Sequence, residues 1–336
     1  MKRTIALLPA LMLLVLMLLP GGCGALKREE NKEETEWIEG AMLKVGDLQI
    51  DYREGLVYLD ATRREYERYY GTGIWDYKIN DKGLLLGNAV KAEVLDSMVY
   101  LKIVCSKADE MNVCLTEDEL READKRADEY MKTLEGSRIL EMGVNENVLR
   151  RIYSDNSLAR KVFEQATLNV DTNIPNEYAK QHHFYSIAVG KKKVGVGGEI
   201  LEFTEEEKAA AREQLGKLKE GWMEAKDLYS YAKTKTEDLT RLDMVIGRGD
   251  LDGSSLENAL MGMRTGGFTD IIEDGDYYYV FYCMTEFDVD ATQEKKEEII
   301  RERQERAFEN LYEKWHEETE VLINHAVWDK MEIPSL

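Results

Sequence analysis

The chain has 336 residues, four cysteines, four histidines and a formal net charge of −21. An excess of carboxylates repels phosphate backbones, so this charge argues against a nucleic-acid partner. The cysteines and histidines do not follow the spacing of a zinc site, so we expect no metal. The length has room for two domains of ordinary size.

The N-terminus has the pattern of a secretory signal. Two basic residues precede a mostly apolar run, 5–19. As a helix this run would be about 22 Å long, which is too short for a hydrocarbon core about 30 Å thick. No later apolar run is long enough to span a membrane, so we expect the rest of the chain to be soluble. The two glycines directly before Cys23 resemble the lipobox of bacterial lipoproteins, in which the cysteine is lipidated.

These features divide the N-terminal region into two segments. We expect 1–22 to be a signal peptide, and 23–40 to be a lipidated cysteine followed by a flexible tether, because the tether has little apolar surface. The protein would then be extracytoplasmic and anchored to the bacterial cell membrane through a lipid on Cys23. The alternative is ordinary cleavage that leaves Cys23 as an unmodified thiol.

The part of the chain before Pro175 has mostly helical periodicity. A strand-like pair of segments comes first, and an apolar stripe at steps of four and three follows, from Val94 to Ala108. Thr116 and Glu119 have the spacing of a capping box, which starts a helix. We expect a hairpin at 43–50 and helices within 61–70, 94–108, 116–134 and 145–167.

Two groups of side chains in this part leave alternatives open. Tyr66, Tyr69 and Tyr70 can pack between helices or line a groove that binds other polypeptides. Cys105 lies on the apolar stripe, as expected of a small core residue. Its spacing from Cys114 allows a disulfide, and nothing in the sequence favours one.

The pattern changes after Pro175, which lies in a breaker-rich segment and marks a domain boundary. Strand and helix signals now alternate, which is the order of an α+β domain. Thr204 and Glu207 form a second capping-box pattern. We expect a strand at 184–189, helices at 204–218 and 222–232, and a short extended segment at 244–246.

The segment 254–287 is the most informative part of this domain. Ser254 and Glu257 have the spacing of a capping box, and the glycine pair 266–267 is expected to end the helix that they start. The turn 274–276 then leads into a run of strand-forming residues, 277–283. The sequence therefore predicts helix, turn and final strand.

From Ala291 the chain has the pattern of a long charged helix with one apolar face. Such a helix gains most of its stability from packing, so we expect it to dock on the N-terminal helices. The second domain, 175–289, would then be inserted into a helical domain formed by 41–174 and 290–336. The residues of the apolar face are Ile300, Ala307, Leu311, Trp315 and Leu322.

Several motifs, taken in order, resemble a known family. The segment 44–50 is similar to its first hairpin, 94–119 to its helix, short extended piece and acid-capped helix, and 315–328 to its terminal helix. Ile246-Gly247-Arg248-Gly249 is similar to the Phe-Gly-Arg-Gly turn before the last helix of a parvulin domain. The chain thus resembles the extracytoplasmic foldases of the PrsA/SurA type, which carry a parvulin-type (PpiC) peptidyl-prolyl isomerase domain.

The resemblance implies an α+β fold in which a helical chaperone domain holds an inserted parvulin-like domain. It also implies a folding factor for unfolded or nascent secreted polypeptides, with prolyl isomerase and chaperone activity and no cofactor. Two alternatives stay open. The parvulin-like domain could have lost catalysis and serve polypeptide binding only, or the chain could be a solute-binding lipoprotein.

The resemblance further implies catalytic residues, although the family's histidines are absent from their usual positions. Ser186 stands at the position of the first-strand histidine, and His183, three residues earlier, is an alternative. Asp238 can stand for the acid of the middle loop, with Glu237 and Thr236 as alternatives, and Tyr279 corresponds to the last-strand histidine.

The family also grips the proline ring with a Phe and a Met. The corresponding substrate-binding residues here are Leu256, which takes the place of the Phe, and Leu251, which lies nearest the position of the Met. Met244 belongs to what is left of the loop motif.

Overall fold

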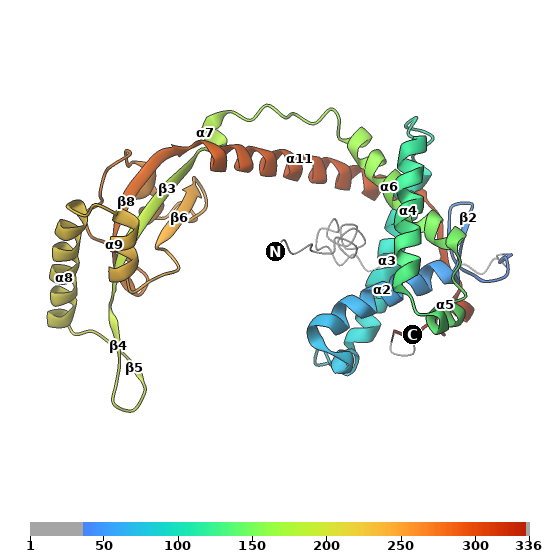
Figure 1. Ribbon diagram of the computed structural model, residues 1–336, viewed down its shortest axis with the longest axis horizontal. Coiled ribbons are helices and arrows are strands. Elements are labelled where there is room, and N and C mark those ends of the chain that lie inside the picture. The colour runs from blue at the N-terminus through green and yellow to red at the C-terminus, as the bar shows by residue number, and fades with distance from the viewer. Residues whose placement is uncertain (1–35, 334–336) are drawn as a thin grey trace. The chain divides into compact units, whose positions relative to one another are not determined.

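The computed structural model describes residues 36–333, so the expected signal peptide and Cys23 lie outside the described residues. The described chain forms two compact units (Figure 1). The first contains the residues up to Val170 and those from Gln304 on, and the second is Asp171–Arg303. The α+β class, with one domain inserted into a helical domain, is confirmed. None of the described helices is long and apolar enough to cross a membrane.

The first unit combines helices with a small antiparallel sheet of order β2-β1-β9. The predicted N-terminal hairpin is present, and the third strand comes from the C-terminal end of the chain. The elements are β1 (Ala41–Val45), β2 (Leu48–Asp51), α2 (Tyr52–Tyr70), the 3-10 helix η1 (Thr72–Asp76), α3 (Leu86–Ser106), α4 (Glu117–Thr133), α5 (Gly136–Met142), α6 (Glu146–Ala166), the second half of α11 (Val289–Glu318), β9 (Val321–Ile323) and α12 (His325–Trp328).

Helix α11 docks on the N-terminal helices, as predicted. The rings of Phe308 and Tyr312 lie 6.4 and 4.5 Å from the ring of Tyr100 on α3. The prediction for Leu322 was wrong, because the helix ends at Glu318 and Leu322 lies on β9, paired with Lys44. This pairing satisfies backbone groups at the edge of β1 that the helix would have left open.

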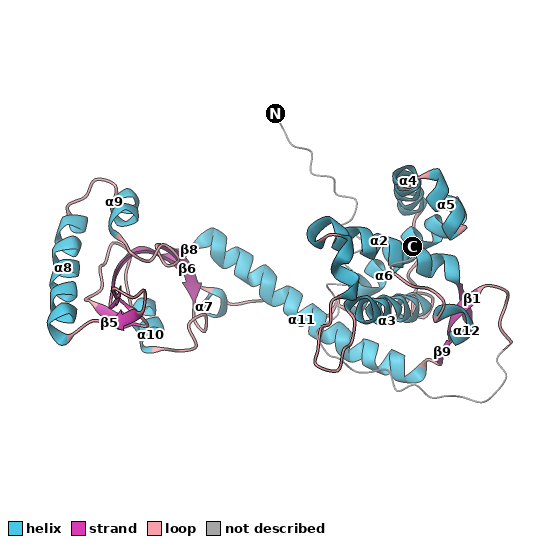
Figure 2. Cartoon of the chain, turned by 90° about the horizontal axis from the view of Figure 1, so that it is seen from below, coloured by secondary structure: helices cyan, strands magenta, loops and turns pink. Residues whose placement is uncertain are grey.

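The second unit is built on a four-stranded antiparallel sheet of order β6-β3-β8-β7. Helices α8 and α9 lie to one side of the strands (Figure 2). The elements are α7 (Asn176–Ala179), β3 (Gln181–Gly190), β4 (Lys192–Val194), β5 (Ile200–Glu202), α8 (Glu205–Met223), α9 (Leu228–Lys235), β6 (Asp243–Gly247), α10 (Ser255–Met261), β7 (Ile272–Asp274), β8 (Tyr277–Asp288) and the first half of α11.

The two faces of this sheet carry separate apolar clusters. Ile187 and Val280 face α8 and α9, whereas Phe184, Tyr279 and Leu256 form the cluster on the other face, where α10 packs. Because neighbouring side chains of a strand point to opposite faces, β3 and β8 each contribute to both clusters.

The helix boundaries of the second unit differ in part from the predictions. The capping box at Thr204 is present, but α8 continues to Met223 and α9 begins only at Leu228. The indole N–H of Trp222 donates to the carbonyl of Leu228 at 2.8 Å, which fixes the turn between the helices. Helix α10 ends at Met261, before the glycine pair, so that pair shapes the following turn instead.

The described cysteines are free thiols. Cys105 and Cys114 do not form the disulfide that their spacing allows. The Cys105 thiol contacts the carbonyl oxygen of Asp155 at 3.2 Å, and Cys283 is buried in the sheet cluster on the α10 face.

A buried lysine joins three helices of the first unit. The Lys102 ammonium on α3 lies 2.6 Å from a carboxylate oxygen of Glu54 on α2 and 2.6 Å from one of Asp155 on α6. Burial opposes its charge, but the two carboxylates outweigh this effect and raise the pKa of Lys102 above its ordinary value.

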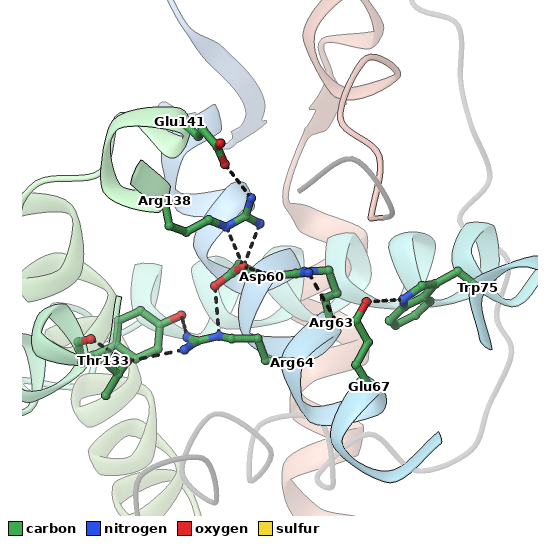
Figure 3. A network of polar contacts seen from close by, with 9 residues as sticks. Asp60, Arg63, Arg64, Glu67, Trp75, Thr133, Arg138 and Glu141 are labelled. Carbon is green, nitrogen blue, oxygen red and sulfur yellow. Dashed lines mark hydrogen bonds and ion pairs between the residues drawn. The ribbon is translucent and has the colours of Figure 1, made fainter. Parts of the chain in front are cut away.

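A buried carboxylate, Asp60 on α2, is surrounded by three arginines (Figure 3). Its Oδ1 accepts hydrogen bonds from Arg138 Nη2 at 2.7 Å and from Arg63 Nη2 at 3.1 Å, and Arg64 Nε lies 3.1 Å from Oδ2. Arg64 also donates to the hydroxyl of Tyr130 at 2.7 Å. One carboxylate therefore links α2 to α4 and α5.

Replacement of this carboxylate tests its importance. Asp60→Asn keeps the shape but removes the charge that three partly buried guanidinium groups share, although Arg63 and Arg138 also pair with Glu67 and Glu141. We therefore expect a loss of about 1.5–3 kcal/mol in the free energy of unfolding. Urea denaturation followed by circular dichroism measures it. The control Asp118→Asn removes an exposed ion pair with Arg121 and should cost less than about 1 kcal/mol. Equal, small losses in both variants would contradict the linking role of Asp60.

Candidate functional site

A hydrogen-bonded pair, Asp238 and Tyr279, lies at the sheet face that α10 covers. The Tyr279 hydroxyl on β8 donates to Asp238 Oδ2 at 2.8 Å. The other carboxylate oxygen accepts from the backbone N–H of Thr240 at 2.9 Å and from its hydroxyl at 2.6 Å. The structure thus brings together two residues that the sequence predicted for the site.

The surroundings of this pair fix its protonation state. Burial opposes ionisation of Asp238, but hydrogen bonds from Thr240 and Tyr279 and the nearby charge of Arg241 outweigh it, so the pKa of Asp238 lies below its ordinary value. Burial and the bond to Asp238 raise the pKa of Tyr279. At neutral pH the carboxylate is therefore ionised and the tyrosine is protonated.

Arg241 adds a positive charge beside the ring. Its guanidinium carbon lies 5.3 Å from the centroid of the Tyr279 ring, within the range of a cation–π contact. Arg241 Nη1 donates a hydrogen bond to Oδ2 of Asp274 at 2.5 Å, which holds the guanidinium in place. Thr240 and Arg241 are not among the predicted site residues, although both lie close to Asp238 in the sequence.

Ser186 lies on the same face but is engaged elsewhere. Its hydroxyl donates to the backbone carbonyl of Arg241 at 2.7 Å, and its N–H donates to the carbonyl of Leu242 at 3.0 Å. The residue is fully buried. Ser186 therefore holds the loop that carries Asp238, and its hydroxyl proton is used in that contact.

The two adjacent histidines lie on opposite faces of β3. The ring of His183 contacts Tyr185 edge-on at 5.4 Å, and its Nε2 lies 2.5 Å from a carboxylate oxygen of Asp243. His183 is therefore on the α8 side, away from Tyr279. The ring of His182 stacks on Phe184 at 5.8 Å, which places it on the α10 side.

His182 was overlooked in the sequence, although strand alternation with Ser186 would have placed it on this face. It is only 3% exposed, and its Nδ1 has no hydrogen-bond partner among the described residues. Burial, together with the nearby charge of Lys180, lowers the pKa of His182.

The predicted substrate-binding residues lie together. Leu256 is buried in the apolar cluster that contains Tyr279, and Met244 and Leu251 are partly exposed and pack against it. Met261 and Met263 are also partly exposed and pack against this cluster. We call Met244, Leu251, Met261 and Met263 the apolar rim of the cluster. Methionine side chains adapt to differently shaped partners, so the rim suits varied apolar residues.

Glu257 organises the loop beside this rim. Only half of its predicted capping box forms: Ser254 accepts from the Glu257 N–H at 3.1 Å, but the carboxylate does not return to Ser254. It accepts instead from the N–H groups of Leu251 at 3.0 Å and Gly253 at 3.2 Å. Backbone N–H groups of Gly249, Leu251 and Gly253 lower the pKa of Glu257. The bond from the Leu251 N–H also holds Leu251 in place.

The state of His182 should make stability depend on pH. The pKa of His182 is lowered in the folded state. Below about pH 6.5 the unfolded chain therefore binds a proton at this residue more readily than the folded chain does, so the free energy of unfolding falls as the pH drops through that value. We expect His182→Gln to reduce the loss of unfolding free energy between about pH 7.5 and 5.5. Urea titrations at several pH values measure it.

The matched control is Leu140→Gln, which replaces an exposed residue without a titrating group and should leave the pH dependence unchanged. A slope that is the same in the wild type and in His182→Gln would contradict the role given to His182.

No family model matches the chain. Two foldase proteins PrsA from Clostridium botulinum strains are each 20% identical to it; one alignment covers 73% of this chain and 77% of the relative, the other 74% and 77%. A solved PrsA structure from Bacillus cereus is 16% identical to this chain, with a TM-score of 0.32, and the match covers 72% of this chain and 90% of that one. A solved PrsA structure from Lactococcus lactis is 12% identical, with a TM-score of 0.34, and the match covers 86% of this chain and 96% of that one. The two sequence alignments confirm the resemblance to foldases of the PrsA type over about three quarters of the chain.

Proposed function

We propose that this chain is an extracytoplasmic folding factor that binds unfolded or nascent secreted polypeptides. The observation that carries the proposal is the similarity to foldase proteins named PrsA over 73% of the chain. The division into a helical unit with an inserted α+β unit supports it, because two units give an extended polypeptide more than one surface to contact.

The candidate site supports a contribution from prolyl isomerisation. Rotation about a prolyl bond needs no covalent step, so a site has only to favour the twisted amide over the planar one, against a barrier of about 18–20 kcal/mol. The rim of Met244 and Leu251 offers apolar surface for a proline ring. The Tyr279 hydroxyl donates its hydrogen bond to the ionised Asp238, so the pair places a fixed negative charge beside this surface.

Two assays on the chain from residue 24 onward test these activities. We expect it to suppress aggregation of a denatured client without nucleotide, and to accelerate cis–trans isomerisation of a proline peptide. Tyr279→Phe should reduce the isomerisation rate at least about tenfold, because Asp238 loses the hydroxyl that fixes its carboxylate. Tyr282→Phe, on the opposite sheet face, is the control and should keep the rate.

Each outcome bears on a separate part of the proposal. Failure to suppress aggregation at molar excess would contradict the folding-factor function. Suppression without any gain in isomerisation rate would restrict the function to polypeptide binding. A full rate in Tyr279→Phe would place catalysis elsewhere.

We also infer a lipid anchor at Cys23, supported by the glycines before it and the apolar run that precedes them. In a bacterial host, we expect a palmitate analogue to label the wild-type protein and the membrane fraction to retain it. The Cys23→Ser variant should lose both properties. Equal labelling of the two proteins would contradict anchoring at this residue.

A further inference from the structure

The loop 236–242, which joins α9 to β6, lies along the edge of β3 beyond the residues that pair with β6. The Glu237 N–H donates to the carbonyl of Ala188 at 2.9 Å, and the Glu237 carboxylate accepts from the N–H of Gly190 at 2.8 Å. These bonds hold the loop on β3 without the side chain of Arg241. The role of that side chain therefore lies elsewhere.

The Arg241 side chain is directed to the pair formed by Asp238 and Tyr279. Its guanidinium carbon lies 5.3 Å from the centroid of the Tyr279 ring, and its Nη1 donates to Asp274 Oδ2 on β7 at 2.5 Å. The side chains of Arg241 and Asp274 are each about one-third exposed, so solvent screens their charges only in part. The positive charge of Arg241 acts on the carboxylate of Asp238, which is only 8% exposed.

Three elements place charged or titratable groups around Asp238. Its own loop supplies Arg241 and Glu237, β7 supplies Asp274, and β8 supplies Tyr279. The two other carboxylates are already engaged, Glu237 by a backbone N–H of β3 and Asp274 by Arg241 itself. Burial opposes the charge of Asp238, and the guanidinium of Arg241 favours it.

We propose that Arg241 is a positioning residue of the candidate site, which keeps Asp238 charged and so keeps the Tyr279 hydroxyl bonded to a carboxylate. A hydrogen bond to an ionised acceptor is shorter and stronger than one to a neutral acceptor, so the charged pair is held more rigidly. The consequence for catalysis rests on the proposed function, whereas the charge of Asp238 can be measured without it. Arg241 then lets the site keep its charge in acidic surroundings.

The charge of Asp238 can be measured in the chain from residue 24 onward, with aspartates isotopically labelled at the carboxyl carbon. NMR follows each carboxyl as the pH is lowered, and Asp238→Asn identifies the signal of Asp238 by removing it. We expect Arg241→Gln to raise the midpoint of this titration by about one pH unit, because a nearby opposite charge lowers the pKa of a carboxyl by about that much. Arg241→Lys keeps the charge and should retain most of the wild-type midpoint.

The isomerisation rate of a proline peptide, followed by NMR exchange between about pH 7 and 3, reports the effect on the site. Near neutral pH Asp238 is ionised with or without Arg241, so the wild type and Arg241→Gln should agree within about twofold. On acidification the variant should lose its rate about one pH unit before the wild type does, because its carboxyl binds a proton earlier. A purely structural contribution would lower the rate equally at every pH.

Arg212 provides a matched control on the opposite face of the sheet. Its guanidinium carbon lies 4.5 Å from the ring centroid of Tyr278, and it pairs with Glu273 of β7 at 3.1 Å. Arg212→Gln therefore removes the same combination of contacts, to a tyrosine ring of β8 and an acid of β7, without altering the surroundings of Asp238. We expect this variant to keep the wild-type midpoint and the wild-type rate profile.

The outcomes separate this inference from the proposed function. An unchanged Asp238 midpoint in Arg241→Gln would overturn the inference, and so would a lysine variant that titrates like the glutamine variant. A glutamine variant that fails to fold, as judged by circular dichroism, would show a structural role and would also overturn it. A shifted midpoint in a protein without isomerase activity would support the role of Arg241 and contradict only the catalytic part of the proposed function.

Discussion

The antiparallel pairing of β3 with β8 is the contact on which the inserted unit depends. It sets Ile187 opposite Val280 and Ala188 opposite Tyr279, so each successive pair faces the other side of the sheet. One face then receives α8 and α9, and the other receives α10 and the loop of Asp238. A shift of one residue would move Tyr279 to the α8 face and break its bond to Asp238.

Much of the fold could be predicted because it depends on local chemistry. Thr116 and Thr204 each start a helix through a complete capping box, and each is read within four residues of sequence. The apolar stripe of α3 repeats with the helical period, and its residues Val94, Met98 and Leu101 are buried. Residues 97–104 are all buried, however, so α3 is covered on more faces than one stripe predicts. The place of Asp238 and Tyr279 came from the family resemblance, which supplied the long-range alignment that local patterns lack.

The rest depends on contacts between distant segments, which no local pattern records. Leu322 has helical spacing, yet it lies in strand β9, which pairs with β1 from a distant part of the sequence. Glu257 has the spacing of a capping box, yet its carboxylate accepts hydrogen bonds from the backbone N–H groups of Leu251 and Gly253 instead. Ser186 matches a catalytic position, but its hydroxyl donates to the Arg241 carbonyl. His182 lies on the face of Ser186, which His183 could have reached only through a shift in strand register.

The buried carboxylates explain how so acidic a chain keeps folded cores. Glu54 and Asp60 are buried and form ion pairs with Lys102 and with arginines, so part of the limited positive charge lies beside buried carboxylates. Asp238 accepts hydrogen bonds instead. The excess of negative charge then falls on the surface.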